Sequence, residues 1–309
     1  MAGGGRAPRA GVVRAAVGGV YEVELDSGDV LAASLRGRIK KQDRTRDRVV
    51  AGDRVLVDVA ADGAATIDAV EPRRSALSRR APGRGGHHAK LIAANIDAVL
   101  PVFAATHPEP HLRMLDRFLV LAESNGLPAR VIVNKIDLLG HDAARALFAD
   151  YERAGYAVVL VSARAAIGLD ALRAQVCGAT SVFTGPSGVG KSSLLNALQP
   201  GLALRTGEVS EVVRKGKHTT VSARLVPLDC GGYVVDTPGL RELGLWGIEP
   251  AELDACFPEF RPYLGTCRFA RSCTHTHEPG CAVREAVAAG DISAPRYDSY
   301  AALLAGDPD

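Results

Sequence analysis

The sequence has few aromatic residues and no long hydrophobic run. Aromatic side chains make up 5% of the 309 residues, and Tyr21 is the only one before residue 90. The densest apolar run, residues 98–105, is far shorter than the roughly 20 residues of a membrane-spanning helix. The N-terminal segment lacks a secretory apolar core, because Arg6, Arg9 and Arg14 interrupt it. We therefore expect a cytoplasmic protein without a membrane segment.

Charge is distributed unevenly along the chain. Residues 1–90 hold 17 Lys and Arg against 11 Asp and Glu, whereas the rest of the chain holds 20 against 24. The densest basic segment is residues 36–48, where seven of thirteen side chains are Lys or Arg. Such a basic part favours a polyanionic partner, and a solvated charged surface is the alternative.

The hydrophobic pattern changes twice along the chain and predicts three domains. Up to residue 80, short alternating segments separated by turns predict a small β-barrel of the OB type. Residues 81–90 read as a basic linker rich in Gly. Residues 91–245 alternate apolar strands with helical segments, which predicts an α/β domain with a mainly parallel sheet. Residues 246–309 lose the strand pattern and predict a helical domain.

A complete phosphate-binding motif lies in the α/β domain. GPSGVGKSS matches G-x-x-x-x-G-K-[ST], follows an apolar strand and opens a helix. Its backbone N–H groups can bind phosphate oxygens, its Lys can contact the β- and γ-phosphates, and its first Ser can coordinate Mg²⁺. The nine residues are Gly185, Pro186, Ser187, Gly188, Val189, Gly190, Lys191, Ser192 and Ser193.

Two further motifs indicate that the nucleotide is a guanine nucleotide. Asn134-Lys135-Ile136-Asp137 ends a strand, and the Asp137 carboxylate can accept hydrogen bonds from guanine but not from adenine. Ser162 and Ala163 close a later strand and resemble a segment that supports the base. In residues 236–239, Asp236 can hold Mg²⁺ through water, and the Gly239 N–H can sense the γ-phosphate.

The order of these motifs is inverted relative to Ras-like GTPases, in which the P-loop comes first. Circular permutation explains this order, since the motifs still meet on strand ends around one nucleotide. With the preceding barrel and the following Cys/His cluster, the chain resembles the RsgA (YjeQ) family of bacterial GTPases that depend on the small ribosomal subunit. The resemblance runs from RGRIKK through NKIDL, GPSGVGKSSLLN, GKHTT and DTPGLRELGLW to CTHTHEPGC.

This resemblance implies roles that the motifs alone do not give. Residues 216–220 become the first switch, in which Thr219 or Thr220 would complete the Mg²⁺ shell held by Ser192 and Asp236. Leu240 stands where Ras-like enzymes have a water-orienting glutamine. His218 is the nearest substitute that could orient the attacking water, and the alternative is a switch histidine that contacts rRNA or solvent.

The resemblance also supplies the partner and the activity. It implies a GTPase, stimulated by the 30S subunit, that binds 16S rRNA during late small-subunit maturation, cycles between GTP and GDP, and is a monomer. Because aromatics are scarce in the barrel, we expect contacts to RNA phosphates from Arg36, Arg38, Lys40, Lys41, Arg44, Arg46 and Arg48. The rival functions are a GTP-responsive RNA-binding module without hydrolysis and a metabolic P-loop kinase.

Three of the six cysteines cluster with histidines near the C-terminus. Cys267, Cys273, His275 and Cys281 form a set of three thiolates and one imidazole, which predicts one closed structural Zn²⁺ site. Five residues separate Cys267 from Cys273, which is one more than is usual in the RsgA family. His277 is the competing ligand. We expect the other cysteines, Cys177, Cys230 and Cys256, to contribute packing alone.

Overall fold

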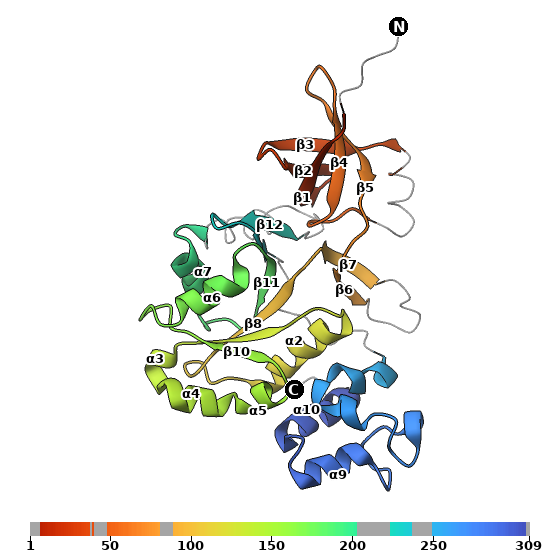
Figure 1. The fold of residues 1–309 in the computed structure, drawn as a ribbon, viewed down its shortest axis with the longest axis vertical. Coiled ribbons are helices and arrows are strands. Elements are labelled where there is room, and N and C mark those ends of the chain that lie inside the picture. The colour runs from red at the N-terminus through yellow and green to blue at the C-terminus, as the bar shows by residue number, and fades with distance from the viewer. Residues whose placement is uncertain are drawn as a thin grey trace.

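A computed structural model describes residues 7–37, 39, 48–80, 89–202, 223–236 and 249–306. Figure 1 shows three parts along the long axis of the molecule. A β-barrel near the N-terminus lies at one end, an α/β domain lies in the middle, and a helical module that ends at the C-terminus lies at the other end. No helix among the described residues is long and apolar enough to cross a membrane.

The barrel confirms the OB-like prediction. Its strands are β1 (Arg9–Val17), β2 (Val20–Leu25), β3 (Val30–Leu35), β4 (Arg54–Val59) and β5 (Ala65–Val70). They pair in the order β1-β2-β3-β5-β4, and a further β1–β4 pairing closes the barrel. Alternate side chains such as Val23, Val55 and Ile67 are fully buried inside, as the period of two requires.

A β-hairpin that the sequence did not predict flanks residues 81–88 and includes the last two residues of the predicted linker. Strands β6 (Ala76–Arg80) and β7 (Ala89–Ala94) pair antiparallel, so residues 89 and 90 belong to a strand. Residues 81–88 lie outside the described part of the chain. Leu77 and Ala93 are buried against the α/β sheet, which explains why these residues form strands. The alternation of apolar and polar residues that predicts a strand is weak here, because the segments contain arginines and small side chains.

The α/β domain has one sheet whose order is β10-β9-β8-β11-β13-β12. Its strands are parallel except β12, which is antiparallel to β13. The strands are β8 (Ala98–Ala104), β9 (Arg130–Asn134), β10 (Ala157–Leu160), β11 (Thr180–Thr184), β12 (Arg224–Pro227) and β13 (Tyr233–Asp236). This confirms the mainly parallel α/β prediction.

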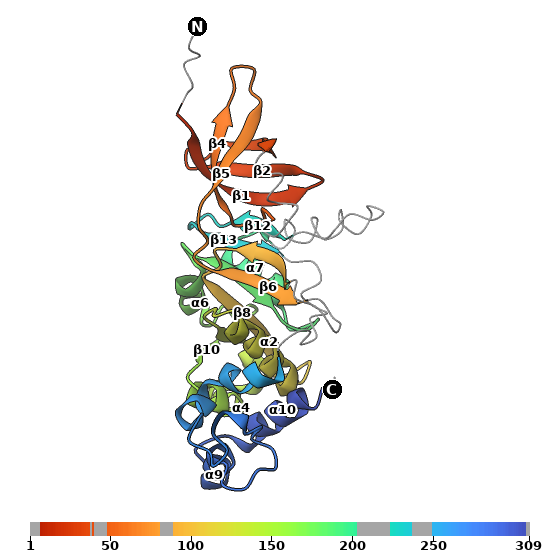
Figure 2. The same cartoon turned by 90° about the vertical axis from the view of Figure 1, so that its right-hand side faces the viewer.

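Helices cover both faces of this sheet, as Figures 1 and 2 show. One face packs on α6 (Leu169–Val176) and α7 (Lys191–Leu198). The other face packs on α2 (Leu112–Ser124), α4 (His141–Leu147) and α5 (Ala149–Arg153), while the short α3 (Ile136–Leu139) follows β9. All seven residues of β8 are buried, since both faces are covered.

The barrel and the α/β domain share a continuous sheet. Strand β1 pairs antiparallel with β12 at Ala15 and Arg224, which joins the two units into eleven strands. The Arg224 guanidinium also donates to both carboxylate oxygens of Glu22 over 2.8 and 2.9 Å. The barrel is therefore attached to the α/β sheet by a strand contact and an ion pair.

The C-terminal module consists of short helical pieces, as predicted. It contains the 3-10 turns η2 (Pro250–Glu252), η3 (Asp254–Cys256), η4 (Pro258–Tyr263) and η5 (Ala270–Ser272), followed by α9 (Ala282–Ala289) and α10 (Ala294–Leu304). Phe257, Phe260 and Tyr300 form its aromatic core, with ring centres 5.0–5.5 Å apart. This aromatic cluster stabilises a module that has little regular secondary structure.

A buried arginine fixes this module to the α/β domain. Arg296 of α10 donates from Nη1 to Asp116 of α2 over 2.5 Å, and from Nε and Nη2 to Glu259 over 2.7 and 3.0 Å. Its guanidinium also lies 5.3 Å from the ring centre of Tyr151 in α5. A second pair, Arg261 with Glu123 of α2, crosses the same boundary near the surface.

Two cysteines that were expected only to pack form a disulfide. Cys177 follows α6, and Cys230 lies in the turn between β12 and β13. The packing prediction for this pair was wrong, because 53 residues separate the two cysteines in sequence while the sheet brings them together. Cys256 is buried and has a free thiol.

Candidate functional site: a nucleotide-binding edge and a metal cluster

The predicted nucleotide motifs meet at one edge of the α/β sheet. Asn134 ends β9, Thr184 ends β11 just before the P-loop, and Asp236 ends β13. Ser162 follows β10 by two residues. Because these strands are parallel, their carboxyl ends lie on the same side, where α/β sheets bind ligands. Segments separated by about 100 residues in sequence thus converge.

The P-loop contains glycines that no other residue could replace without strain. Gly185 has φ +130°, and an added Cβ would lie 2.1 Å from the carbonyl oxygen of Val102 in β8. Gly190 has φ +94°, and a Cβ there would lie 2.4 Å from Asn134 Nδ2. The loop therefore runs directly against β8 and the end of β9.

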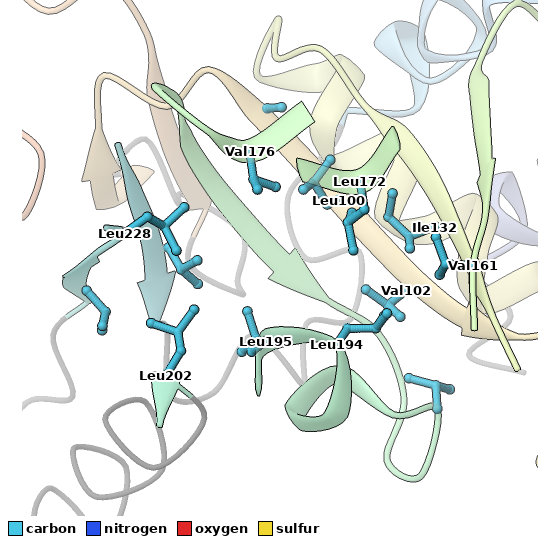
Figure 3. Packing of buried hydrophobic residues seen from close by; sticks show 14 of the residues in the cluster. Leu100, Val102, Ile132, Val161, Leu172, Val176, Leu194, Leu195, Leu202 and Leu228 are labelled. Atoms are coloured by element: carbon cyan, nitrogen blue, oxygen red, sulfur yellow. The ribbon is translucent and has the colours of Figure 1, made fainter. Parts of the chain in front are cut away.

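A buried hydrophobic cluster packs α7, the helix that follows the P-loop, against the sheet. Figure 3 shows Leu194 and Leu195 of α7 facing Leu100, Val102 and other side chains that project from the sheet. Leu194 is fully buried, whereas Ser192 and Ser193 on the same helix are exposed. The helix thus buries one face and leaves the residues of the predicted Mg²⁺ and phosphate site accessible.

Lys191 lies across the P-loop. Its ammonium group donates to the carbonyl oxygens of Gly185, over 2.7 Å, and Pro186. The first residue of α7 thus holds its charge at the loop, next to the N–H groups at the helix N-terminus. This combination of a lysine, a glycine-rich loop and a helix N-terminus suits a polyphosphate.

Asn134 and Lys135 connect the predicted base-binding segment to the P-loop. Asn134 Nδ2 donates to the Val189 carbonyl over 2.9 Å, and its Oδ1 accepts from the Ala163 N–H over 3.1 Å. Lys135, which adopts a left-handed backbone with φ +64°, donates to the carbonyls of Gly188, over 2.7 Å, and His107. These bonds fix three loops relative to one another.

Ser162 orients the carboxylate of Asp137. Its Oγ donates to Asp137 Oδ1 over 2.6 Å and accepts from the Ala165 N–H over 3.0 Å. Ser162 is fully buried, whereas Asp137 is exposed. The exposed carboxylate is held in one orientation at the sheet edge, which fits the recognition of a base edge. Sequence reasoning grouped these residues but missed the His107 carbonyl, for which the sequence gives no signal.

Several predicted residues lie outside the described part of the chain. These are His218, Thr219, Thr220 and Gly239, together with Leu240. Of the predicted magnesium ligands, Ser192 and Asp236 are described, and Asp236 is half-buried at the end of β13.

The predicted metal residues come together in the C-terminal module. Cys267, Cys273, His275 and Cys281 are all buried, and one ligand atom from each lies within 4.8 Å of the others. Cys267 Sγ is 3.9 Å from Cys281 Sγ, and His275 Nδ1 is 3.4 Å from Cys281 Sγ. Thiolates bound to one tetrahedral zinc are about 3.8 Å apart, since each lies about 2.3 Å from the metal. The residues present fit a metal of this kind.

The competing histidine lies elsewhere. His277 is exposed, and its Nδ1 contacts Thr276 Oγ1 at 2.9 Å. Its side chain is not part of the four-residue cluster. The structure therefore places His275, which the sequence favoured, with the three cysteines of the cluster.

Neighbouring groups orient His275 and lower the pKa of Cys267. Asp254 Oδ2 lies 3.4 Å from His275 Nε2, which leaves Nδ1 directed at the thiols. Burial raises the pKa of Cys267, but N–H groups of Ala282 and Val283 in α9 bring that pKa below its ordinary value. Burial raises the pKa of Cys273 to about 12, so its thiol would lose its proton on binding a metal. The sequence pattern gave no sign of Asp254.

The basic segment of the barrel is only partly described. Arg36 pairs with Asp68 at 2.6 Å and with Asp58 at 3.3 Å, both within the barrel. Arg48 is exposed, and Arg38, Lys40, Lys41, Arg44 and Arg46 lie outside the described residues. Arg36 therefore has intramolecular partners that would compete with RNA phosphates.

Comparison with known proteins identifies relatives over almost the whole chain. A family model described as RsgA GTPase matches residues 70–246, more than half of the chain. A protein of Gemmatimonas aurantiaca named small ribosomal subunit biogenesis GTPase RsgA is 55% identical over 295 residues and covers 95% of both chains. A protein of the same name from Moorella thermoacetica is 44% identical over 288 residues and covers 93% of both.

Solved structures agree with these relatives. The crystal structure of YjeQ from Thermotoga maritima has a TM-score of 0.80 at 35% identity and covers 97% of this chain and 98% of its own. The crystal structure of YloQ, described as a circularly permuted GTPase, has a TM-score of 0.75 at 27% identity and covers 99% and 97%. The resemblance inferred from the motifs is confirmed, and the chain belongs to the RsgA family of circularly permuted GTPases, enzymes that hydrolyse GTP.

Proposed function

We propose that this GTPase binds the 30S ribosomal subunit and hydrolyses GTP to GDP and phosphate there, as a late maturation factor that contacts 16S rRNA. We further propose that it acts as a monomer in the cytoplasm, with Mg²⁺ accompanying the nucleotide and one structural Zn²⁺ in the C-terminal module. The relatives that cover nearly the whole chain are named for small-subunit biogenesis, which supports this assignment.

The observation that carries the GTPase part is the connection between the P-loop and the base-binding segment. Asn134 and Lys135 each donate to a P-loop carbonyl. Asp137 lies in the same segment, and Ser162 holds its carboxylate in place. A nucleotide that binds phosphates at residues 185–193 would therefore place its base next to Asp137. This arrangement favours guanine over adenine, because a carboxylate accepts from the guanine N–H groups.

Magnesium would be held by the predicted set of Ser192, Asp236 and Thr219 or Thr220. Ser192 is exposed at the first turn of α7, and Asp236 ends the strand next to β11. Mg²⁺ prefers oxygen ligands and retains water molecules, so few protein ligands are sufficient. When bound, it neutralises charge on the β- and γ-phosphates.

Hydrolysis requires a group that orients water, and Leu240 cannot supply it. We propose His218 for this role, with the 30S subunit ordering the switch around it. His218 belongs to the predicted first switch at residues 216–220. We therefore expect the subunit to stimulate hydrolysis, since the attacking water must be held in position.

Zinc is the metal proposed for the C-terminal cluster. Three sulfur ligands and one imidazole favour Zn²⁺ over Mg²⁺ or Ca²⁺, which prefer oxygen. The four buried side chains leave no position for substrate water, so the role would be structural. The metal would stabilise a module that carries four short 3-10 turns.

GTP hydrolysis with and without purified 30S subunits tests the proposal. We expect slow turnover alone and much faster turnover with 30S, and the His218→Ala variant should keep its GDP affinity while losing the stimulated rate. Equal turnover in both conditions would refute the 30S-dependent mechanism. GTP-dependent 30S binding without hydrolysis would instead indicate an RNA-binding module, and phosphoryl transfer from ATP to a small molecule would indicate a kinase.

A further inference from the structure

The six cysteines fall into three chemically different groups. Cys267, Cys273 and Cys281 belong to the metal cluster and are buried. Burial raises the pKa of the Cys256 thiol to about 11, so that thiol stays protonated and unreactive near neutral pH. Cys177 and Cys230 form the disulfide, and Cys230 is exposed. Only this pair is open to a thiol reagent from solution.

The disulfide strengthens a contact that the backbone already makes. The Gly178 N–H donates to the Gly231 carbonyl over 2.8 Å, and the Tyr233 N–H donates to the Ala179 carbonyl over 2.9 Å. These bonds join the segment that directly follows Cys177 to the end of the β12–β13 turn and the start of β13, which directly follow Cys230. Breaking the S–S bond would therefore leave the fold intact and remove one covalent restraint from the turn.

The same turn contacts the end of the P-loop helix. The Asp229 N–H donates to Gln199 Oε1 over 2.8 Å, and Gln199 directly follows α7. A cavity of about 140 Å³ lies between them, lined by residues that include Leu198, Asp229 and Cys230. The Cys230 side chain thus has room to move when it is not cross-linked. Its movement would loosen the turn at the end of the helix that begins with Lys191.

The turn also lies between the two switch segments of the chain. Strand β12 comes after residues 216–220, the first switch, and β13 ends at Asp236, where residues 236–239 begin. Both strands of this hairpin therefore lead to the nucleotide edge. A restraint on the turn limits how far the hairpin can shift relative to β11, with which β13 pairs.

We propose that Cys177 and Cys230 form a reversible redox site whose reaction partner is a dithiol reductant, and that its oxidation state sets the rate of guanine nucleotide release. The inference depends on nucleotide binding and not on the proposed ribosomal partner. The oxidised form holds the β12–β13 turn and releases nucleotide slowly. The reduced form leaves the turn without this restraint and releases the nucleotide faster.

The chemistry is thiol–disulfide exchange. A thiolate of the dithiol attacks the exposed Cys230 sulfur, the S–S bond breaks, and Cys177 leaves as a thiolate that takes up a proton. The second thiol of the reductant then attacks the mixed disulfide and releases Cys230 as a thiol. Two electrons pass to the protein disulfide, and the dithiol becomes a disulfide. Oxidised glutathione would reverse the reaction through the same kind of intermediate.

Release of a fluorescent GDP analogue tests the proposal on the full-length, metal-loaded protein. We expect release from protein treated with dithiothreitol to be about fivefold faster than from protein treated with oxidised glutathione, at the lower end of coupling between linked sites. Alkylation followed by mass spectrometry should show Cys177 and Cys230 protected after oxidation, and Cys230 labelled first after reduction.

The matched control is the Cys177→Ser/Cys230→Ser double variant, which keeps the other four cysteines. It should release nucleotide at the fast rate in both treatments, with an unchanged metal content. Equal release rates for the oxidised and reduced wild type would overturn the proposal. A redox response that persists in the double variant would also overturn it, because the response would then come from the metal cluster or Cys256. A pair that no glutathione ratio reduces would be structural and not a switch.

Discussion

Replacement of Arg296 by Met should destabilise the joint between the C-terminal module and the α/β domain. Arg296 and Asp116 are each 2% exposed, and Glu259 is 9% exposed at its side chain. Methionine keeps the length of the aliphatic stem but leaves two buried carboxylates without their cation. Removing one partner of a buried ion pair costs about 3–5 kcal/mol. We expect a loss of this size in the free energy of unfolding at pH 7.

Arg261→Met is the matched control for this experiment. Arg261 also pairs with a carboxylate of α2, but its side chain is 49% exposed. Exposed pairs contribute about 0–1 kcal/mol, so this variant should remain close to wild type. Urea unfolding of both variants, followed by circular dichroism, measures the difference. Equal losses in the two variants would refute the argument from burial.

The pH dependence separates lost charge compensation from lost packing. Burial raises the pKa of Asp116 even beside Arg296. A carboxyl whose pKa is higher in the folded than in the unfolded state binds its proton more readily when folded, so stability rises as the pH falls towards that pKa. Loss of Arg296 removes the charge and the hydrogen bond that lower the pKa of Asp116, so acidification stabilises the variant more than the wild type. The deficit of Arg296→Met should therefore shrink between pH 7 and pH 5. A deficit that does not depend on pH would indicate packing alone.

Three further predictions concern the nucleotide and metal sites. Asp137→Asn should weaken GTP binding by at least about tenfold and shift preference towards xanthine nucleotides, as calorimetric titration would show, because the carboxylate receives the guanine N–H groups. Gly190→Ala should abolish measurable GDP binding, since its Cβ would displace Asn134, whereas Gly155→Ala, with nothing within 4 Å of its Cβ, should bind normally. Cys273→Ala or chelation should unfold the C-terminal module, seen as lost helical dichroism, while GDP binding survives; a module that stays folded without metal would contradict this.

The parts of the fold that the sequence predicted best are those fixed by local backbone chemistry. The P-loop was predictable because Gly185, Gly190 and Lys191 stand at fixed offsets between a strand and a helix. The four metal residues were predictable for the same reason, since they lie within fifteen positions of one another. In both cases a short segment contains most of the chemistry.

The features that the sequence did not predict depend on contacts between distant segments. Nothing near Cys177 in sequence points to Cys230, and nothing near Arg296 points to Asp116, 180 positions away. The pairing of β6 with β7 was not predicted, because the burial of Leu77 depends on the neighbouring sheet. Tertiary packing decided these positions, and a single sequence contains no local record of it.

The strand contact between the barrel and the α/β sheet has a consequence for aggregation. Strand β12 is the last strand of the α/β sheet, and an uncovered last strand offers N–H and C=O groups to any other β-chain. Here β1 occupies that position at Ala15, and the Glu22 carboxylate neutralises Arg224 beside it. The N-terminal barrel therefore shields the β12 edge of the α/β sheet from edge-to-edge association with other molecules. A shortened chain that begins after the barrel would expose β12 as an edge strand together with an unpaired Arg224.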